Sequence, residues 1–149
     1  MNEFKPFDDK LAGLIASLSP AARRRMTAEI AKKLRASQQQ RIKRQQAPDG
    51  TPYAARKRQP MKGKKGRVKR EMFTKLRTNR YMKAKGTDNV AAVEFVGRVQ
   101  RMARVHQEGL RDKPNRYSAG VQYEARPLLG GTHEDAQLLQ SIIIDYLNK

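Results

Sequence analysis

Cysteine is absent from this chain of 149 residues, which excludes disulfide bonds and cysteine-ligated metal sites. Tryptophan is absent too, and aromatic residues make up only 6% of the chain, so few side chains can stack on nucleic-acid bases. No hydrophobic run approaches the roughly 20 residues that span a bilayer, and the first residues lack the hydrophobic run of a signal peptide. We therefore expect no membrane partner, and the composition suits a reducing cytoplasm.

Acidic residues are scarce in the middle of the chain. Residues 20–80 hold 21 of the 33 Lys and Arg but only three of the 14 Asp and Glu, so they carry nearly all of the net charge of +19. Such a block repels itself unless it is solvated or matched by an acidic partner. The candidate contacts to DNA or to an acidic protein are Arg56, Lys57, Arg58, Lys62, Lys64, Lys65, Arg67, Lys69 and Arg70.

This basic block has very few aromatic residues, which limits the kind of contact that it could make with a partner. Tyr53 is the only aromatic residue between residues 20 and 72. Contacts to DNA should therefore be made to phosphates and should not depend on sequence. Charge alone favours DNA and an acidic protein surface equally, so both partners stay open.

Residues suited to catalysis or to metal binding are also few. The two histidines, His106 and His133, belong to no cluster with the spacing of metal ligands. No serine elbow, phosphate-binding glycine loop or carboxylate pair stands out. We expect no enzyme activity, metal or cofactor. His106 should be a structural hydrogen-bonding residue near a helix end, and His133 should lie in a solvated first turn.

Hydrophobic spacing predicts helices along much of the chain. Thr132 can cap a C-terminal helix, with Asp135 completing a capping box, and the hydrophobic face of this helix should carry the core. Ser19 and Pro20 favour the start of a long helix that reaches about Gln46. Its second half has few hydrophobic residues and should project or lie against another subunit. The predicted helices cover residues 8–18, 20–46, 72–76, 102–108 and 132–147.

Alternating hydrophobic residues predict short strands at 80–85 and 90–96, joined by a turn at 86–89. A third strand should end near Tyr123, after a polar loop at 111–120. Because helices come first, strands follow and a helix closes the chain, we expect an α+β fold with a small antiparallel sheet flanked by helices.

Several residues should shape turns and helix ends. Asp49 and Gly50 fit a tight turn, and Gly109 should end the helix at 102–108. Arg126 is a candidate for a structural ion pair or for binding backbone carbonyls, because its planar guanidinium suits both. The expected structural positions are Asp49, Gly50, His106, Gly109, Arg126, Pro127 and Gly130.

The length of the chain predicts a single domain over residues 1–149. Within it we expect N-terminal helices at 1–46, a basic loop or arm at 47–70 and an α+β body at 71–149, with residues 55–67 mobile in the isolated chain. The hydrophobic fraction of 38% is low for this length, which favours burial against other subunits.

Several short motifs follow one another along most of the chain. They are Met1-Asn2-Glu3-Phe4-Lys5, Leu14-Ile15 with Ser17-Leu18-Ser19-Pro20, Arg23-Arg24-Arg25, Ala47-Pro48-Asp49-Gly50-Thr51-Pro52-Tyr53-Ala54, Gly66-Arg67-Val68-Lys69-Arg70, Met72-Phe73, Val105-His106-Gln107 with Gly109, and Ala125-Arg126-Pro127-Leu128-Leu129-Gly130. In their order and spacing these motifs resemble the phage virion morphogenesis family. This family includes tail completion proteins of temperate contractile-tailed enterobacterial phages and relatives like the Mu G protein.

The resemblance implies a structural protein of the virion, assembled in the cytoplasm of the host bacterium. It would complete the head-proximal end of the tail and help to join tail to head, as a ring around the DNA channel, with a hexamer favoured. Its partners would be tail-tube, tail-terminator or head-connector proteins, reached in part by the basic arm, which could also contact DNA. A small basic nucleic-acid-binding module is the alternative.

Overall fold

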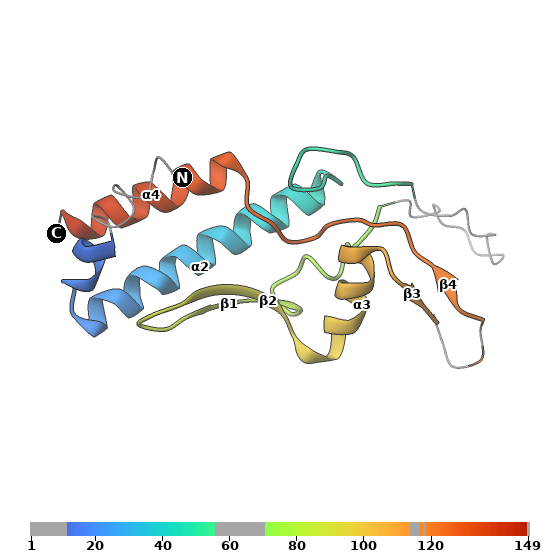
Figure 1. Ribbon diagram of the computed structural model, residues 1–149, viewed down its shortest axis with the longest axis horizontal. Helices are drawn as coiled ribbons and strands as arrows, with labels where there is room; N and C mark the ends of the chain where they lie inside the picture. The colour runs from blue at the N-terminus through green and yellow to red at the C-terminus, as the bar shows by residue number, and fades with distance from the viewer. Residues whose placement is uncertain (1–11, 56–70, 114–116, 118, 149) are drawn as a thin grey trace, which may run out of the picture. The chain divides into compact units, whose positions relative to one another are not determined.

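The computed structural model describes residues 12–55, 71–113, 117 and 119–148. The nine basic residues at 56–70 and the first four residues of the expected helix at 8–18 therefore lie outside the described residues. Residues 12–16 are helical. The other elements are α2 (Pro20–Lys43), β1 (Met82–Gly86), β2 (Ala91–Phe95), α3 (Gly97–Glu108), β3 (Arg111–Asp112), β4 (Val121–Gln122) and α4 (His133–Leu147) (Figure 1).

The expected α+β fold is confirmed, although its strands form two separate two-stranded sheets. β1 pairs with β2, and β3 pairs antiparallel with β4, so that Arg111 lies opposite Gln122 and Asp112 opposite Val121. None of the helices in the described ranges is both long and hydrophobic enough to cross a membrane.

The chain divides into two compact units whose segments alternate along the sequence. Unit 1 consists of Met1–Ala36, Ala84–Glu94 and His133–Lys149. Unit 2 consists of Ser37–Lys83 and Phe95–Thr132. Helix α2 and strands β1 and β2 therefore contribute residues to both units.

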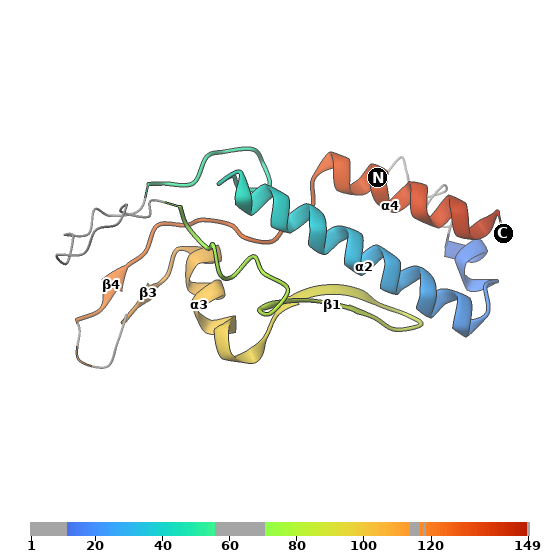
Figure 2. The same ribbon diagram turned by 180° about the vertical axis from the view of Figure 1, so that it is seen from behind.

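The core of unit 1 forms between the first part of α2 and α4, which lie alongside each other in both views (Figures 1 and 2). Met26 and Ile30 of α2 and Ile142 of α4 are its buried centre. The expected hydrophobic face of α4 is confirmed, but α2 supplies two of the three central residues. The partly buried residues around them are Ile15, Leu18, Leu34, Ala91, Leu138, Leu139, Ile143 and Tyr146.

The start of α2 matches its expected cap. The helix begins at Pro20, whose missing amide hydrogen costs nothing at the first helical position. The Ser19 hydroxyl oxygen accepts a hydrogen bond from the Ala22 amide at 3.1 Å, which satisfies one of the free donors of the first turn.

The turn of the β1–β2 hairpin is tied to α2 within unit 1. The Thr87 hydroxyl accepts hydrogen bonds from the amides of Asn89 and Val90, and the Thr27 hydroxyl donates to the Thr87 carbonyl oxygen. A Cβ atom added at Gly86 would clash with the α2 backbone at Ala28. The close approach of hairpin and helix therefore requires glycine at this position.

The end of α2 and the segment at 72–76 differ from expectation. The helix ends at Lys43 because Gln45 adopts a left-handed φ of 59°. Residues 74–77 form a turn and not a helix, and the left-handed φ of 67° at Phe73 excludes regular helical geometry there.

The second half of α2 does not project, because Ile42 is fully buried and Gln38 and Arg41 are buried within the chain.

Helix α3 begins at Gly97, five residues earlier than expected, and it ends at the left-handed Gly109 as expected. β3 lies inside the expected polar loop.

Ile142→Ala should lower the free energy of unfolding by about 2–5 kcal/mol, because it leaves a cavity in the core of unit 1. Urea unfolding followed by circular dichroism measures this loss. Ile144→Ala, on the same helix at a side chain that is 49% exposed, is the matched control and should cost less than about 1 kcal/mol. Equal losses for the two variants would contradict this packing.

Candidate interaction site in unit 2

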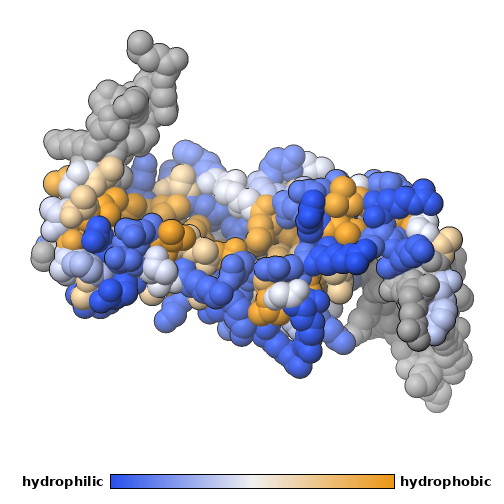
Figure 3. Space-filling model, turned by 60° about the horizontal axis from the view of Figure 1, so that its bottom comes forward, coloured by the Kyte–Doolittle hydropathy of each residue, from blue (hydrophilic) through white to orange (hydrophobic). Residues whose placement is uncertain are grey.

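The positive charge of the described residues is concentrated in unit 2. Its described residues include thirteen Lys and Arg against five Asp and Glu, whereas unit 1 has seven against six. On the face drawn in Figure 3, hydrophilic residues cover most of the described surface, and hydrophobic residues show as small patches between them. The described part of unit 2 therefore favours a negatively charged partner even without the nine basic residues at 56–70.

The chain that leads into residues 56–70 is fixed by Arg126. This side chain is 5% exposed. Its Nε donates to the Ala54 carbonyl oxygen at 2.8 Å, and its Nη2 donates to the Ala55 carbonyl oxygen at 3.1 Å. Carbonyl binding is one of the two roles expected for Arg126. Burial lowers the pKa of the guanidinium and Glu124 raises it, but arginine remains charged.

The chain that leaves residues 56–70 is fixed by Gln45. Its Oε1 accepts a hydrogen bond from the Met72 amide at 2.6 Å, and its Nε2 donates to the Met72 carbonyl oxygen at 2.8 Å. One side chain thus binds both backbone polar groups of Met72, as a neighbouring strand would.

A row of aromatic rings joins the two ends. The Tyr53 and Phe73 rings meet edge to face with centroids 5.5 Å apart. Phe73 then contacts the His106 ring at 5.0 Å, and His106 contacts the Tyr123 ring at 5.0 Å. Residues just before and just after the basic segment at 56–70 therefore pack together in unit 2. We call this group of Gln45, Tyr53, Phe73, His106 and Arg126 the anchor cluster.

The backbone of residues 126–130 supports the anchor cluster although it belongs to no sheet. Gln107 Oε1 accepts hydrogen bonds from the amides of Leu128 and Leu129, at 2.7 and 2.9 Å, and its Nε2 donates to the Leu129 carbonyl oxygen. The Tyr53 hydroxyl donates to the Pro127 carbonyl oxygen at 2.7 Å. Side chains therefore replace the neighbouring strand that would otherwise pair this backbone.

Helix α2 binds the same segment from its second half. Arg41 donates to the carbonyl oxygens of Leu128 and Gly130, at 2.7 and 3.1 Å. Gln38 Oε1 accepts from the Gly130 amide and from Arg41 itself. These contacts explain why two polar side chains of α2 are buried.

The expected structural residues all lie in unit 2. At the turn, Gly50 has a φ of 87°, and its amide donates to the Ala47 carbonyl oxygen at 2.9 Å. The Asp49 carboxylate accepts from the Thr51 amide, which lowers its pKa. A Cβ atom at Gly130 would lie 2.5 Å from Pro48, so the turn packs directly on residues 126–130.

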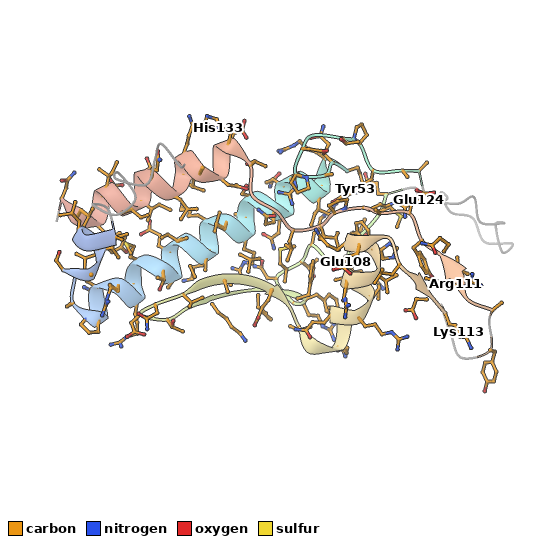
Figure 4. All side chains as sticks on the ribbon, viewed as in Figure 1. Tyr53, Glu108, Arg111, Lys113, Glu124 and His133 are labelled. Atoms are coloured by element: carbon orange, nitrogen blue, oxygen red, sulfur yellow. The ribbon has the colours of Figure 1, made fainter. Side chains whose placement is uncertain are left out.

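Sequence reasoning missed the glutamines of this site and Arg41. Gln38, Gln45 and Gln107 bind backbone groups more than 20 residues away, and glutamine is common on exposed helices. The β3–β4 hairpin adds Arg111 and Lys113 to the cations of unit 2 (Figure 4). Within the described ranges, no group of three His, Asp or Glu is placed to hold a metal ion.

His106 has an unusual environment for a histidine. It is 8% exposed, and its buried Nδ1 has no hydrogen-bond partner among the described residues, so the expected side-chain hydrogen bond is not made there. Its backbone carbonyl oxygen instead accepts from the Arg126 amide at 2.7 Å. Burial, and then the nearby charge of Arg126, lower the pKa of the imidazole below its ordinary value.

Comparison with known proteins gives two matches. The model of the phage virion morphogenesis family matches residues 2–148. Tail completion protein S of Escherichia phage P2 is 50% identical over 150 residues, which cover 100% of both chains. No solved structure matches the chain.

Gln45→Leu should raise the hydrogen-exchange rate of the Met72 amide about tenfold or more, because it removes two hydrogen bonds worth about 1 kcal/mol each. Exchange monitored by NMR or by mass spectrometry of short peptides measures this. Gln40→Leu, at an exposed residue of α2, is the control and should leave that rate unchanged. An unchanged rate in Gln45→Leu would contradict the anchoring of Met72.

The free energy of unfolding should fall as the pH decreases below about 6.5, because the folded state disfavours protonated His106 while the unfolded state binds the proton with the ordinary pKa. Denaturant titrations between pH 5 and 7.5 measure this slope, which His106→Gln should reduce. His133→Gln, at an exposed histidine, should retain it. If the free energy of unfolding depends on pH in the same way in the wild type and in His106→Gln, His106 is not the cause of this dependence.

Proposed function

Because the chain belongs to the phage virion morphogenesis family, we propose that it is a structural protein that completes the head-proximal end of a phage tail and helps to join the tail to the head. The observation that carries this proposal is the 50% identity to tail completion protein S of phage P2 over the whole length of both chains. In this role the chain acts by binding other virion proteins in the tail and not by catalysis.

The anchor cluster supports a binding role for the basic segment at 56–70. Arg126 holds the residues before this segment, and Gln45 holds Met72 after it. A segment whose two ends are already fixed loses less conformational entropy when it binds than a free tail would. We propose that its nine cations contact an acidic neighbour in the tail or head connector, or phosphates of the DNA in the channel.

We also propose that the chain forms a ring around the DNA channel, with a hexamer favoured. Its neighbours would be tail-tube, tail-terminator or head-connector proteins. A ring brings identical basic segments close together, so the repulsion between them must be offset by DNA or by acidic partners. Partner binding should therefore weaken as the salt concentration rises.

A small basic nucleic-acid-binding module is the second candidate, and the net charge of +19 favours it. Such a module would bind duplex DNA tightly as a monomer at physiological salt. A ring with weak affinity for free DNA supports the tail role. A gel-shift titration combined with mass measurement of the assembly separates the two functions.

Replacing Lys62, Lys64 and Lys65 with Gln should leave the circular dichroism spectrum and the unfolding midpoint unchanged but should lower the yield of infectious particles at least tenfold. Free heads and free tails should accumulate, because the contact across the joint is weakened. Complementation of a phage that lacks this protein, with electron microscopy of the lysate, measures both effects.

The matched control removes the same amount of charge from unit 1, through Arg24→Gln, Lys32→Gln and Lys33→Gln at exposed residues of α2. It should support a near-normal yield. Normal infectivity of the variant at Lys62, Lys64 and Lys65 would reject a role for the basic segment. If both triple variants lose infectivity equally, the loss follows from the reduced net charge and not from the basic segment in particular.

A further inference from the structure

The outer face of α4 differs from the rest of the surface because it carries no charge along its centre. The exposed residues there are spaced three and four apart, so they form one stripe on the helix. In a chain with 32% charged residues, this stripe contains no Lys, Arg, Asp or Glu. Its exposed members are His133, Gln137, Gln140, Ser141 and Ile144.

Helix α2 shows what an ordinary solvated face looks like in this chain. Its exposed residues include five cations. By contrast, α4 contains no Lys or Arg at all, and Ile144 on its stripe is 49% exposed. His133 lies on the side of α4 that faces away from α2 (Figure 4). Depletion of charge around an exposed hydrophobic side chain is typical of the centre of a protein interface. The exposed cations of α2 are Arg24, Arg25, Lys32, Lys33 and Lys43.

The charges beside the stripe indicate the kind of partner. Glu134 and Asp145 are exposed along one flank of the stripe, so this border of the face is acidic. Unit 2 has the opposite character, with thirteen Lys and Arg against five Asp and Glu among its described residues, and only Arg41 and Arg126 of these cations are buried. The two surfaces are therefore electrostatically complementary.

We propose that the outer face of α4 docks on unit 2 of a second copy of this chain. This inference rests on the proposed ring, and it adds the surfaces that neighbouring subunits would use. A contact between α4 of one copy and α4 of another would place acidic flank against acidic flank, and a contact between two copies of unit 2 would place basic surface against basic surface, so both are repulsive. A contact between α4 and unit 2 joins unlike surfaces and avoids this repulsion, and its head-to-tail repetition gives a ring when the rotation from one copy to the next closes.

Photo-crosslinking identifies the surface that α4 contacts. A photoreactive amino acid replaces Gln140 in the full-length chain, and ¹⁵N-labelled and unlabelled protein are mixed so that crosslinks between copies can be recognised by mass. The expected crosslinked peptide comes from residues 37–83 or 95–132 of the other copy. A crosslink to α4 or to another part of unit 1, or a chain that stays monomeric without any crosslink, overturns the inference.

A charge placed on the stripe tests the contact energetically. Ile144→Lys should raise the concentration at which half of the chains are assembled by at least tenfold, measured by sedimentation velocity, and its unfolding midpoint should stay that of the wild type. Val90→Lys replaces another hydrophobic residue of unit 1, which is 55% exposed and lies outside α4, and it is the control. An Ile144→Lys chain that assembles as well as the Val90→Lys chain overturns the inference.

The same variants separate this inference from the proposed function. If Ile144→Lys assembles and restores infectious particles to a phage that lacks the protein, the α4 contact is wrong but the tail role stands. If the wild-type chain itself fails to restore infectivity, the tail role is wrong whatever the crosslinks show.

Discussion

The backbone at residues 126–130 is the constraint on which unit 2 depends, because it is buried or partly buried and pairs with no strand. A buried amide or carbonyl without a hydrogen bond costs about 1–3 kcal/mol, so several together would prevent folding. Gln38, Arg41 and Gln107 supply the missing partners from two different helices. Removing any one of them therefore affects more than its own contact, since the others depend on the same stretch of backbone.

This constraint explains how a strongly basic segment can be attached firmly to a chain with a modest hydrophobic core. Arg126 begins the supported backbone and reaches across to Ala54 and Ala55. Gln45 and the ring contact between Tyr53 and Phe73 complete the connection on the other side. The charge excess in unit 2 and the nearly neutral unit 1 then give the chain two different kinds of surface, as a subunit that contacts unlike neighbours requires.

Local sequence signals predicted much of the fold but little of this site. Some residues act only on near neighbours in the sequence, so their roles could be predicted from their chemistry; these are Ser19, Pro20, Gly50 and Gly109. The hydrophobic face of α4 was equally clear from its spacing. Gln45 and Gln107 bind backbone more than 20 residues away, and nothing nearby marks them. The predicted helix at 72–76 was wrong because Phe73, a member of the anchor cluster, has a left-handed backbone conformation.

The distance between the two ends of the basic segment tests the anchoring most directly. Because the chain has no cysteine, spin labels can be attached at Ala55→Cys and Glu71→Cys alone, and both positions are exposed. Pulsed electron paramagnetic resonance on the free protein should give one narrow distance distribution, which stays in place when a partner binds. A broad distribution in the free protein that narrows only on binding would contradict the anchor cluster.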